Sequence, residues 1–415
     1  MTFRDLVRRT RSVRFLPDGA NPDAGIILGA RAIRGLGDGF VSVLIPVRLA
    51  QLGFGESAVG AIASATLFGS AMVTLAAGML AGRVGVRRML LAAGLVMAAS
   101  GIGFASFTEF WFLFGIAFIG TLNPTAGDVS VFLPVEQSAL PDTAPPRART
   151  ALFARYRMVG SLAAAIGALL AGLPYWLEDW IGLSITTLVA LMFVLYAGLG
   201  LIVFARYRRL SDYHSKPKAT RPLVESKAIV YRLTALFALD SFASGFVVQS
   251  MLALWLAERH GFSVATTGVI FFWLGLLNAF SQLLASPLAE RFGLVNVMVF
   301  THLPANIFLI LAPFMPTAGL ALTMLALRSL FSSMDAPARA SYVMAVVPEA
   351  ERAAASSITN APRGLAQSFS PAIAGWLLGL TTFGIPLVIG GSLKAIYDLL
   401  LWSGFRALKP PEEAE

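Results

Sequence analysis

Four aspartates lie inside long apolar segments of the chain. They are Asp38, Asp128, Asp240 and Asp335. A carboxylate exposed to lipid at the centre of a membrane span costs roughly 2.5–3.5 kcal/mol, so four would cost about 10 kcal/mol or more, comparable with the net stability of a whole protein. The four side chains must therefore face protein or water. A carboxyl group in a partly dehydrated cavity can bind a cation or a proton, and competition between the two is the simplest basis for proton antiport.

Arginines stand four or seven residues from two of these aspartates, which places each set on one helix face. The sets are Arg31 and Arg34 with Asp38, and Arg328 and Arg339 with Asp335. Two roles are open for the arginines: they neutralise the acids, or they coordinate an anionic substrate. Asp128 and Asp240 have no cation within one helical turn, so with Asp38 they are the stronger candidates for a cation or proton site. Asn123 is a candidate hydrogen-bonding group for the substrate, although intramembrane polar residues also bind neighbouring helices.

The elements that must position these residues are membrane-spanning helices. Of the 415 residues, 57% are hydrophobic and only 13% are charged, whereas charged residues make up about 25% of an ordinary soluble protein. Because about 20 residues cross the hydrocarbon core, the chain is long enough for twelve spans. We predict the first six helices over residues 26–50, 57–81, 89–107, 111–135, 151–174 and 183–204. The second six are predicted over residues 229–256, 264–288, 294–313, 318–345, 356–380 and 385–406.

Most of the 32 lysines and arginines fall in alternate loops. The positive-inside bias predicts a multi-pass protein of the inner membrane with both termini in the cytoplasm. It also explains the formal charge of +9 without a nucleic-acid partner, since these cations lack an aromatic stacking platform. The expected parts are a cytoplasmic segment (1–25), a six-helix bundle (26–204), a linker (205–228), a second bundle (229–406) and a tail (407–415). The basic first segment fits either a membrane-surface helix or a disordered tail.

The two halves of the chain repeat one another. Residues 80–85 (LAGRVG) correspond to residues 288–293 (LAERFG) at an offset of 208, and Asp128 corresponds to Asp335 at an offset of 207. A third match joins the LAQLGF and LAERHGF segments that begin at residues 49 and 256. Internal repeats of this kind are typical of secondary transporters.

The segment GMLAGRVGVRRML over residues 78–90 resembles the G-x-L-a-D-R-x-G-R-R-x-x-L signature of the major facilitator superfamily. Gly82 and Val86 stand where that signature usually has Asp and Arg. The resemblance covers nearly the whole chain and implies an all-α membrane protein of 12 transmembrane helices in two pseudosymmetric six-helix bundles. It also implies alternating access around a central cavity lined by helices 1, 4, 7 and 10. The similarity to drug/proton antiporters is loose, because their helix 4 signature is missing.

The same resemblance implies a charge lock at the cytoplasmic gate. The acid missing at Gly82 is present in the second-half copy as Glu290, so we expect the lock to depend on Glu290 and on first-half arginines. The predicted gate residues are Arg83, Arg87, Arg88, Glu290 and Arg291. The alternative is that these are turn residues and ordinary positive-inside arginines.

Several kinds of chemistry are not expected. The chain has no cysteine, which excludes disulfides and thiolate metal sites, and it contains neither a GxxxxGK[ST] loop nor a GxSxG motif. Its three histidines, His214, His260 and His302, are scattered, so we interpret them as structural and predict no metal site, no cofactor and no enzymatic activity.

We therefore predict a secondary active transporter, expected as a monomer in the lipid bilayer, that couples protons to efflux of a small amphipathic or cationic molecule. One alternative is uptake of an organic anion bound by the cavity arginines. A second alternative is a membrane receptor or scaffold that does not transport.

Overall fold

The computed structural model describes residues 16–126, 132–145, 148–212, 223–348, 351–406 and 408. The first half contains α2 (Pro22–Gln51), α3 (Glu56–Val84), α4 (Val86–Ser106), α5 (Phe110–Ile119), α6 (Phe132–Ala139), η1 (Leu140–Thr143), α7 (Arg149–Leu170), α8 (Leu173–Ile181) and α9 (Ile185–Tyr207). The second half contains α10 (Lys227–Gly245), α11 (Gln249–His260), α12 (Val264–Phe292), α13 (Leu294–Leu311), η3 (Ala312–Phe314), α14 (Ala318–Phe331), α15 (Asp335–Val346), α16 (Arg352–Leu380) and α17 (Ile385–Phe405). The basic segment before residue 16 and Asp128 lie outside the described residues.

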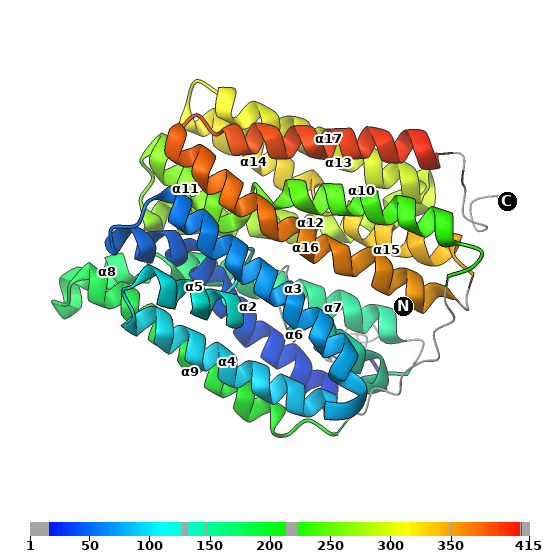
Figure 1. Cartoon of the computed structure of the whole chain (residues 1–415), viewed down its shortest axis with the longest axis horizontal. Helices are drawn as coiled ribbons and strands as arrows, with labels where there is room; N and C mark the ends of the chain where they lie inside the picture. Colours follow the sequence, from blue (N-terminus) through cyan, green and yellow to red (C-terminus); the bar gives the residue numbers. More distant parts are fainter. Residues whose placement is uncertain are drawn as a thin grey trace, which may run out of the picture.

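The predicted all-helical architecture with twelve crossings is confirmed. Eight segments in the described part of the chain are long and apolar enough to span a membrane. The other four crossings are α2, which carries charged residues, the α5–α6 and α14–α15 pairs, and α16, which carries several polar residues. In Figure 1 the helices run roughly side by side, with the first half, blue to green, below the second half, green to red.

Three of the twelve crossings are each interrupted, a feature that the sequence analysis did not predict. Crossing 4 divides into α5 and α6, crossing 7 into α10 and α11, and crossing 10 into α14 and α15. The first break contains Pro124, which lacks an amide donor, and Ala126 in the left-handed region at φ 53°. The second break follows Gly245, where α16 lies so close that an added Cβ would be 2.1 Å from Ser370 Oγ. The third break comes immediately before Asp335.

The repeat predicted from the sequence is visible in the packing. In the first half α2 packs on α7 and α4 on α9, and in the second half α10 packs on α16 and α13 on α17. The turns match as well, because Gly85 between α3 and α4 has φ 79° and Gly293 between α12 and α13 has φ 82°. Only glycine adopts this conformation without strain.

The most extensive contacts between the halves are those of α3 with α16 and of α7 with α12. Glycines allow the closest approach at the end of the bundle that carries the turns at 52–55 and 381–384. An added Cβ on Gly60 would lie 2.4 Å from Pro371 O, and one on Gly375 would lie 2.4 Å from Glu56 O. An added Cβ on Gly268 would lie 2.5 Å from Ala168 O. If both termini are cytoplasmic, as we predict, this closed end is the outer one.

The start of the second half is fastened to the loop before α16 by one carboxylate. Glu351 accepts hydrogen bonds from the backbone amides of Val224 at 2.9 Å, Glu225 at 3.0 Å and Ser226 at 3.1 Å, and from the Ser226 hydroxyl. These donors lower the pKa of Glu351 from its usual 4.5 to about 2, the Ser226 hydroxyl having the largest effect. The charged form of Glu351 therefore holds the end of the linker in place.

Glu351→Gln should reduce thermal stability at pH 7, because an amide cannot accept all four hydrogen bonds. We expect the melting temperature in detergent to fall by about 2 °C or more. Since the folded pKa is depressed, the stabilisation is present above pH 4.5 and is lost as the pH falls toward 2. Melting curves at steps from pH 7 to pH 3 should show the difference from wild type shrinking. Glu225→Gln, which changes an exposed neighbour, is the control, and an equal effect of both variants would contradict the interpretation.

Candidate functional site

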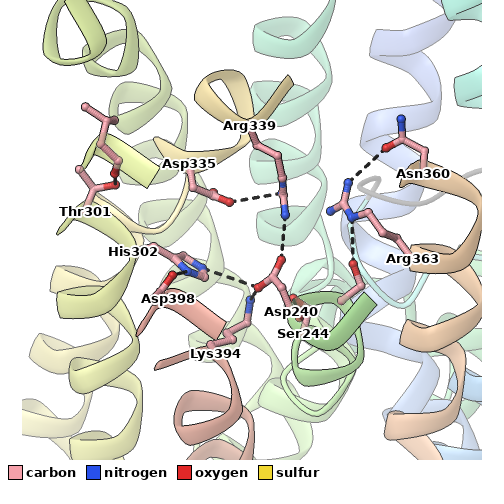
Figure 2. Close-up of polar contacts among 12 residues, drawn as sticks. Asp240, Ser244, Thr301, His302, Asp335, Arg339, Asn360, Arg363, Lys394 and Asp398 are labelled. Carbon is pink, nitrogen blue, oxygen red and sulfur yellow. Dashed lines mark hydrogen bonds and ion pairs between the residues drawn. The ribbon is translucent and has the colours of Figure 1, made fainter. Parts of the chain in front are cut away.

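A network of charged side chains lies inside the second half, centred on Asp240 of α10 (Figure 2). Arg339 Nη1 donates to Asp240 Oδ2 at 2.9 Å, and Lys394 Nζ donates to Asp240 Oδ1 at 2.8 Å. Arg339 Nη2 also lies 3.3 Å from Asp335 Oδ2. All four side chains are buried. Two acids and two bases thus neutralise one another across α10, α15 and α17, as buried charges require.

His302 of α13 extends this network toward a third acid. Its Nδ1 lies 2.9 Å from Asp398 Oδ1, and its Nε2 lies 4.0 Å from Asp240 Oδ1. Asn306, one turn further along α13, donates to Asp398 Oδ2 at 2.8 Å. The pairs 302/306 and 394/398 each have a four-residue spacing, so the packing of α13 on α17 brings all four together. A buried imidazole between two carboxylates has the chemistry needed to carry a proton.

Arg363 of α16 lies at the edge of the network and differs from the other cations. Its Nε donates to Ser241 Oγ at 3.0 Å and its Nη1 donates to Asn360 Oδ1 at 3.4 Å. Figure 2 shows this guanidinium on the far side of Asp240 from His302. Both of its hydrogen-bond partners are neutral, and its side chain is only partly buried.

The first half has its own charged cluster, around Glu136 of α6. Glu136 accepts hydrogen bonds from Arg34 of α2, Tyr156 of α7 and Tyr207 of α9. The Arg34 guanidinium also stacks 4.2 Å above the Phe132 ring. Arg34 is 1% exposed and Glu136 is 0% exposed. One carboxylate thus holds three helices around α6.

Asp38 lies one turn from Arg34 on α2, and its side chain is 3% exposed. Its Oδ2 has no hydrogen-bond donor among the described residues. The backbone around it is tightly packed, since an added Cβ on Gly39 would lie 2.1 Å from Ala164 O of α7. A buried carboxyl oxygen without a donor is rare in proteins and marks a candidate for ligand or proton binding.

The sequence of each half matches a known protein family. The sequence profile of the Major Facilitator Superfamily matches residues 27–248 and 233–415, one match for each half. The chain belongs to the Major Facilitator Superfamily. It is a multi-pass membrane protein whose fold is that of membrane transporters.

Individual relatives agree with this assignment. The chain is 24% identical to the uncharacterized membrane protein YJR124C of Saccharomyces cerevisiae, and the match covers 92% of this chain and 94% of the yeast protein. A crystal structure of a mutant nucleoside transporter NupG superposes with a TM-score of 0.72 at 14% identity, covering 93% of this chain and 100% of NupG. A bacterial homolog of the human lysosomal transporter Spinster, inward-facing and occupied, has a TM-score of 0.71 at 17% identity, covering 94% and 99%. At these identities the solved structures establish the fold only.

Most of the predicted site residues lie in two separate groups, one in each half of the protein. Arg31, Arg34 and Asp38 lie on α2 in the first half, whereas Asp240, Asp335 and Arg339 lie together in the second. The ion pairs described between helices each join residues of one half.

The remaining predicted site residues lie at or near helix breaks. Arg328 is in the last turn of α14. Asn123 is buried in the α5–α6 connection, where its Oδ1 accepts from Thr125 N at 2.9 Å and Thr125 Oγ1 at 2.6 Å. Asp128 falls in the same connection, outside the described residues.

Sequence reasoning missed several members of these networks. Asp240 has no cation nearby on its own helix, but α15 and α17 supply Arg339 and Lys394. His302 was interpreted as an isolated structural histidine, although Asp398 is its hydrogen-bonding neighbour. The available signal was a pair of polar residues four apart within an apolar span, as in 302/306 and 394/398. Glu136 was overlooked because it lies near a predicted helix end.

Only some side chains of the predicted cytoplasmic gate are among the described residues. Arg87 Nη2 donates to Arg208 O at 2.6 Å, and Arg87 Nη1 lies 3.8 Å from Asp212 Oδ2. Arg88 and Arg291 are exposed, and Arg291 stacks over the neighbouring Phe292 at 5.3 Å. The side chains of Arg83 and Glu290 lie outside the described residues, so the charge lock stays a prediction.

Proposed function

We propose that this protein is a proton-coupled transporter of a small molecule that works by alternating access, with Asp38 as the proton-binding group of the first half. The observation that supports this proposal is the buried Asp38 carboxyl group, whose Oδ2 has no hydrogen-bond donor among the described residues. Arg34, one turn away on α2, is already held by Glu136. Asp38 is therefore not locked into a permanent ion pair, and a proton can neutralise it.

Coupling follows from the cost of burying a charge. A transporter half that opens to water hydrates Asp38, and closing that half around an unpaired carboxylate carries a large desolvation penalty. A proton or a bound substrate that neutralises the group removes this penalty, so the closed state is reached only in a loaded form. The His302–Asp398 pair offers a second site of the same kind in the other half, with donors already in place.

We propose the inner membrane as the location, with both termini cytoplasmic, because the loop charges favour that topology. We propose efflux as the direction of transport. We also propose a monomer as the working unit. The charge of the substrate distinguishes the two transport hypotheses, which are efflux of an amphipathic or cationic molecule and uptake of an organic anion. An amphipathic cation would use Asp38, whereas an organic anion would need a cavity cation that is not already paired with an acid.

Asp38→Asn should abolish proton-driven transport while leaving the protein folded, because asparagine has almost the same volume but cannot bind a proton. Purified protein in liposomes is given a mixture of small metabolites and drugs, and mass spectrometry measures what accumulates under pH gradients of either direction. We expect gradient-driven accumulation by wild type to fall at least tenfold in the variant, which corresponds to about 1.4 kcal/mol or more. The direction of the effective gradient also separates efflux from uptake.

Two variants serve as controls. Asp38→Glu keeps an ionisable group and should retain part of the gradient-driven flux, and Asp18→Asn removes an exposed carboxylate and should leave it unchanged. Unaltered gradient-driven accumulation in Asp38→Asn would refute Asp38 as the coupling group. No transport by wild type under any gradient would favour the receptor or scaffold alternative.

A further inference from the structure

One face of α16 carries a stripe of polar side chains. They are Ser356, Asn360, Arg363 and Gln367, spaced four, three and four residues apart. This spacing places them within one narrow sector of the helix surface. All four side chains are at least partly exposed in the described protein.

The opposite face of the same helix is apolar and exposed. Phe369, Ile373 and Trp376 are 58%, 39% and 56% exposed, as expected for side chains that contact lipid. Polar groups facing lipid are costly, so the helix turns its apolar face to the bilayer and its polar stripe away from it. The stripe therefore lines the inside of the protein.

Arg363 is the charged member of this stripe. Its two hydrogen-bond acceptors, Ser241 Oγ and Asn360 Oδ1, are neutral, and its Nη2 makes no hydrogen bond to any residue that the structure describes. Arg339 and Lys394, by contrast, are both bound to Asp240. Arg363 thus has donors available and no carboxylate in contact, whereas Arg339 and Lys394 are each paired with an acid.

We propose that Arg363 binds the carboxylate of a small organic anion, so that this charge completes the site. The guanidinium presents Nη2 together with a neighbouring N–H as a fork that matches the two oxygens of a carboxylate. Ser241 accepts from Nε through its oxygen, so its own hydroxyl proton can be donated to the same ligand. The inference rests on the proposed transport function and deepens it, because it assigns the substrate a negative charge and places its head group between α10 and α16.

Ligand binding tests this assignment without requiring transport. The full-length protein is purified in detergent, and its melting temperature and tryptophan fluorescence are measured with acetate, benzoate or succinate, and with acetamide, benzamide or succinamide as uncharged matches. We expect at least one carboxylate to raise the melting temperature and to bind saturably, whereas its amide does neither. The absence of an effect from all three carboxylates would overturn the proposal.

Variants then locate the site. Arg363→Gln should weaken carboxylate binding about tenfold or more, and Arg363→Lys should weaken it less, because the charge is kept but the fork is lost. Arg352→Gln changes an exposed arginine on the same helix and should bind like wild type. Should Arg363→Gln fail to fold, Ser241→Ala is measured instead, with an expected weakening of several fold. Carboxylate binding that is unchanged in the folded Arg363 variants would refute the site.

Asp38→Asn distinguishes this proposal from the coupling mechanism. It should lose gradient-driven transport but keep carboxylate binding, because the ligand's head group contacts the other half of the protein. Loss of coupling with intact binding would support both assignments. Intact coupling with intact binding would refute only the role of Asp38, and loss of binding in Asp38→Asn would refute the assignment of the head group to Arg363 alone.

Discussion

Asp240→Asn should be among the most destabilising single substitutions in the second half. It leaves Arg339 and Lys394 buried and facing a neutral amide, at positions where each now lies within 2.9 Å of a carboxylate oxygen. Removing one partner of a buried ion pair costs about 3–5 kcal/mol, because the remaining charge is uncompensated. Asp335 can neutralise only one of the two cations. We therefore expect poor expression and a much lower melting temperature rather than a folded protein that is merely uncoupled.

A double substitution separates lost compensation from lost volume. Asp240→Asn combined with Lys394→Met removes one acid and one base together, leaves Arg339 with Asp335, and should recover most of the stability. Asp179→Asn, at an exposed carboxylate, should be neutral. Asp240→Asn, Asp179→Asn and the double variant are compared by thermal unfolding in the same detergent. A melting temperature of Asp240→Asn equal to that of Asp179→Asn would show that the network contributes nothing to stability.

The fold could be predicted from the sequence because its determinants are local. Apolar runs of about 20 residues set the crossings, and the matched turns at Gly85 and Gly293 set the repeat. The interruptions before α6, α11 and α15 could not be located, because they depend on neighbours. At Gly245, for example, the close neighbour is Ser370 on α16, which is 125 residues away in the sequence.

The site could be predicted only in part, for a related physical reason. A lone acid in an apolar span indicates that some partner exists but does not identify it. Asp240 and Asp335 were recognised from their cost in a membrane, but the cations that pair with Asp240 lie on the tenth and twelfth crossings, three and five crossings further along the chain. The polar pairs 302/306 and 394/398 are visible in the sequence, but that they meet one another depends on the packing of α13 on α17. The unpaired state of Arg363 has no sequence signal, because it depends on which acids the other cations occupy.

Glu136→Gln should have the corresponding effect in the first half. Arg34 would remain buried against the Phe132 ring without its carboxylate, and an amide can satisfy only some of the three donors now held by Glu136. We expect a loss of about 3–5 kcal/mol, as for other broken buried pairs. Glu109→Gln, at an exposed carboxylate, is the matched control. A melting temperature within error of Glu109→Gln would contradict the assignment of Glu136 as the centre of this cluster.

The same substitution has a functional consequence that stability alone does not produce. Once Glu136 no longer holds it, Arg34 is the cation one turn from Asp38, and the uncompensated guanidinium gains most by pairing with that carboxylate. Asp38 would then be neutralised permanently, so the folded fraction of Glu136→Gln should bind carboxylates normally but lose gradient-driven transport. Adding Arg34→Gln to Glu136→Gln removes the competing cation and should restore part of the coupling. A double variant that folds yet stays as uncoupled as Glu136→Gln would show that Arg34 does not control Asp38.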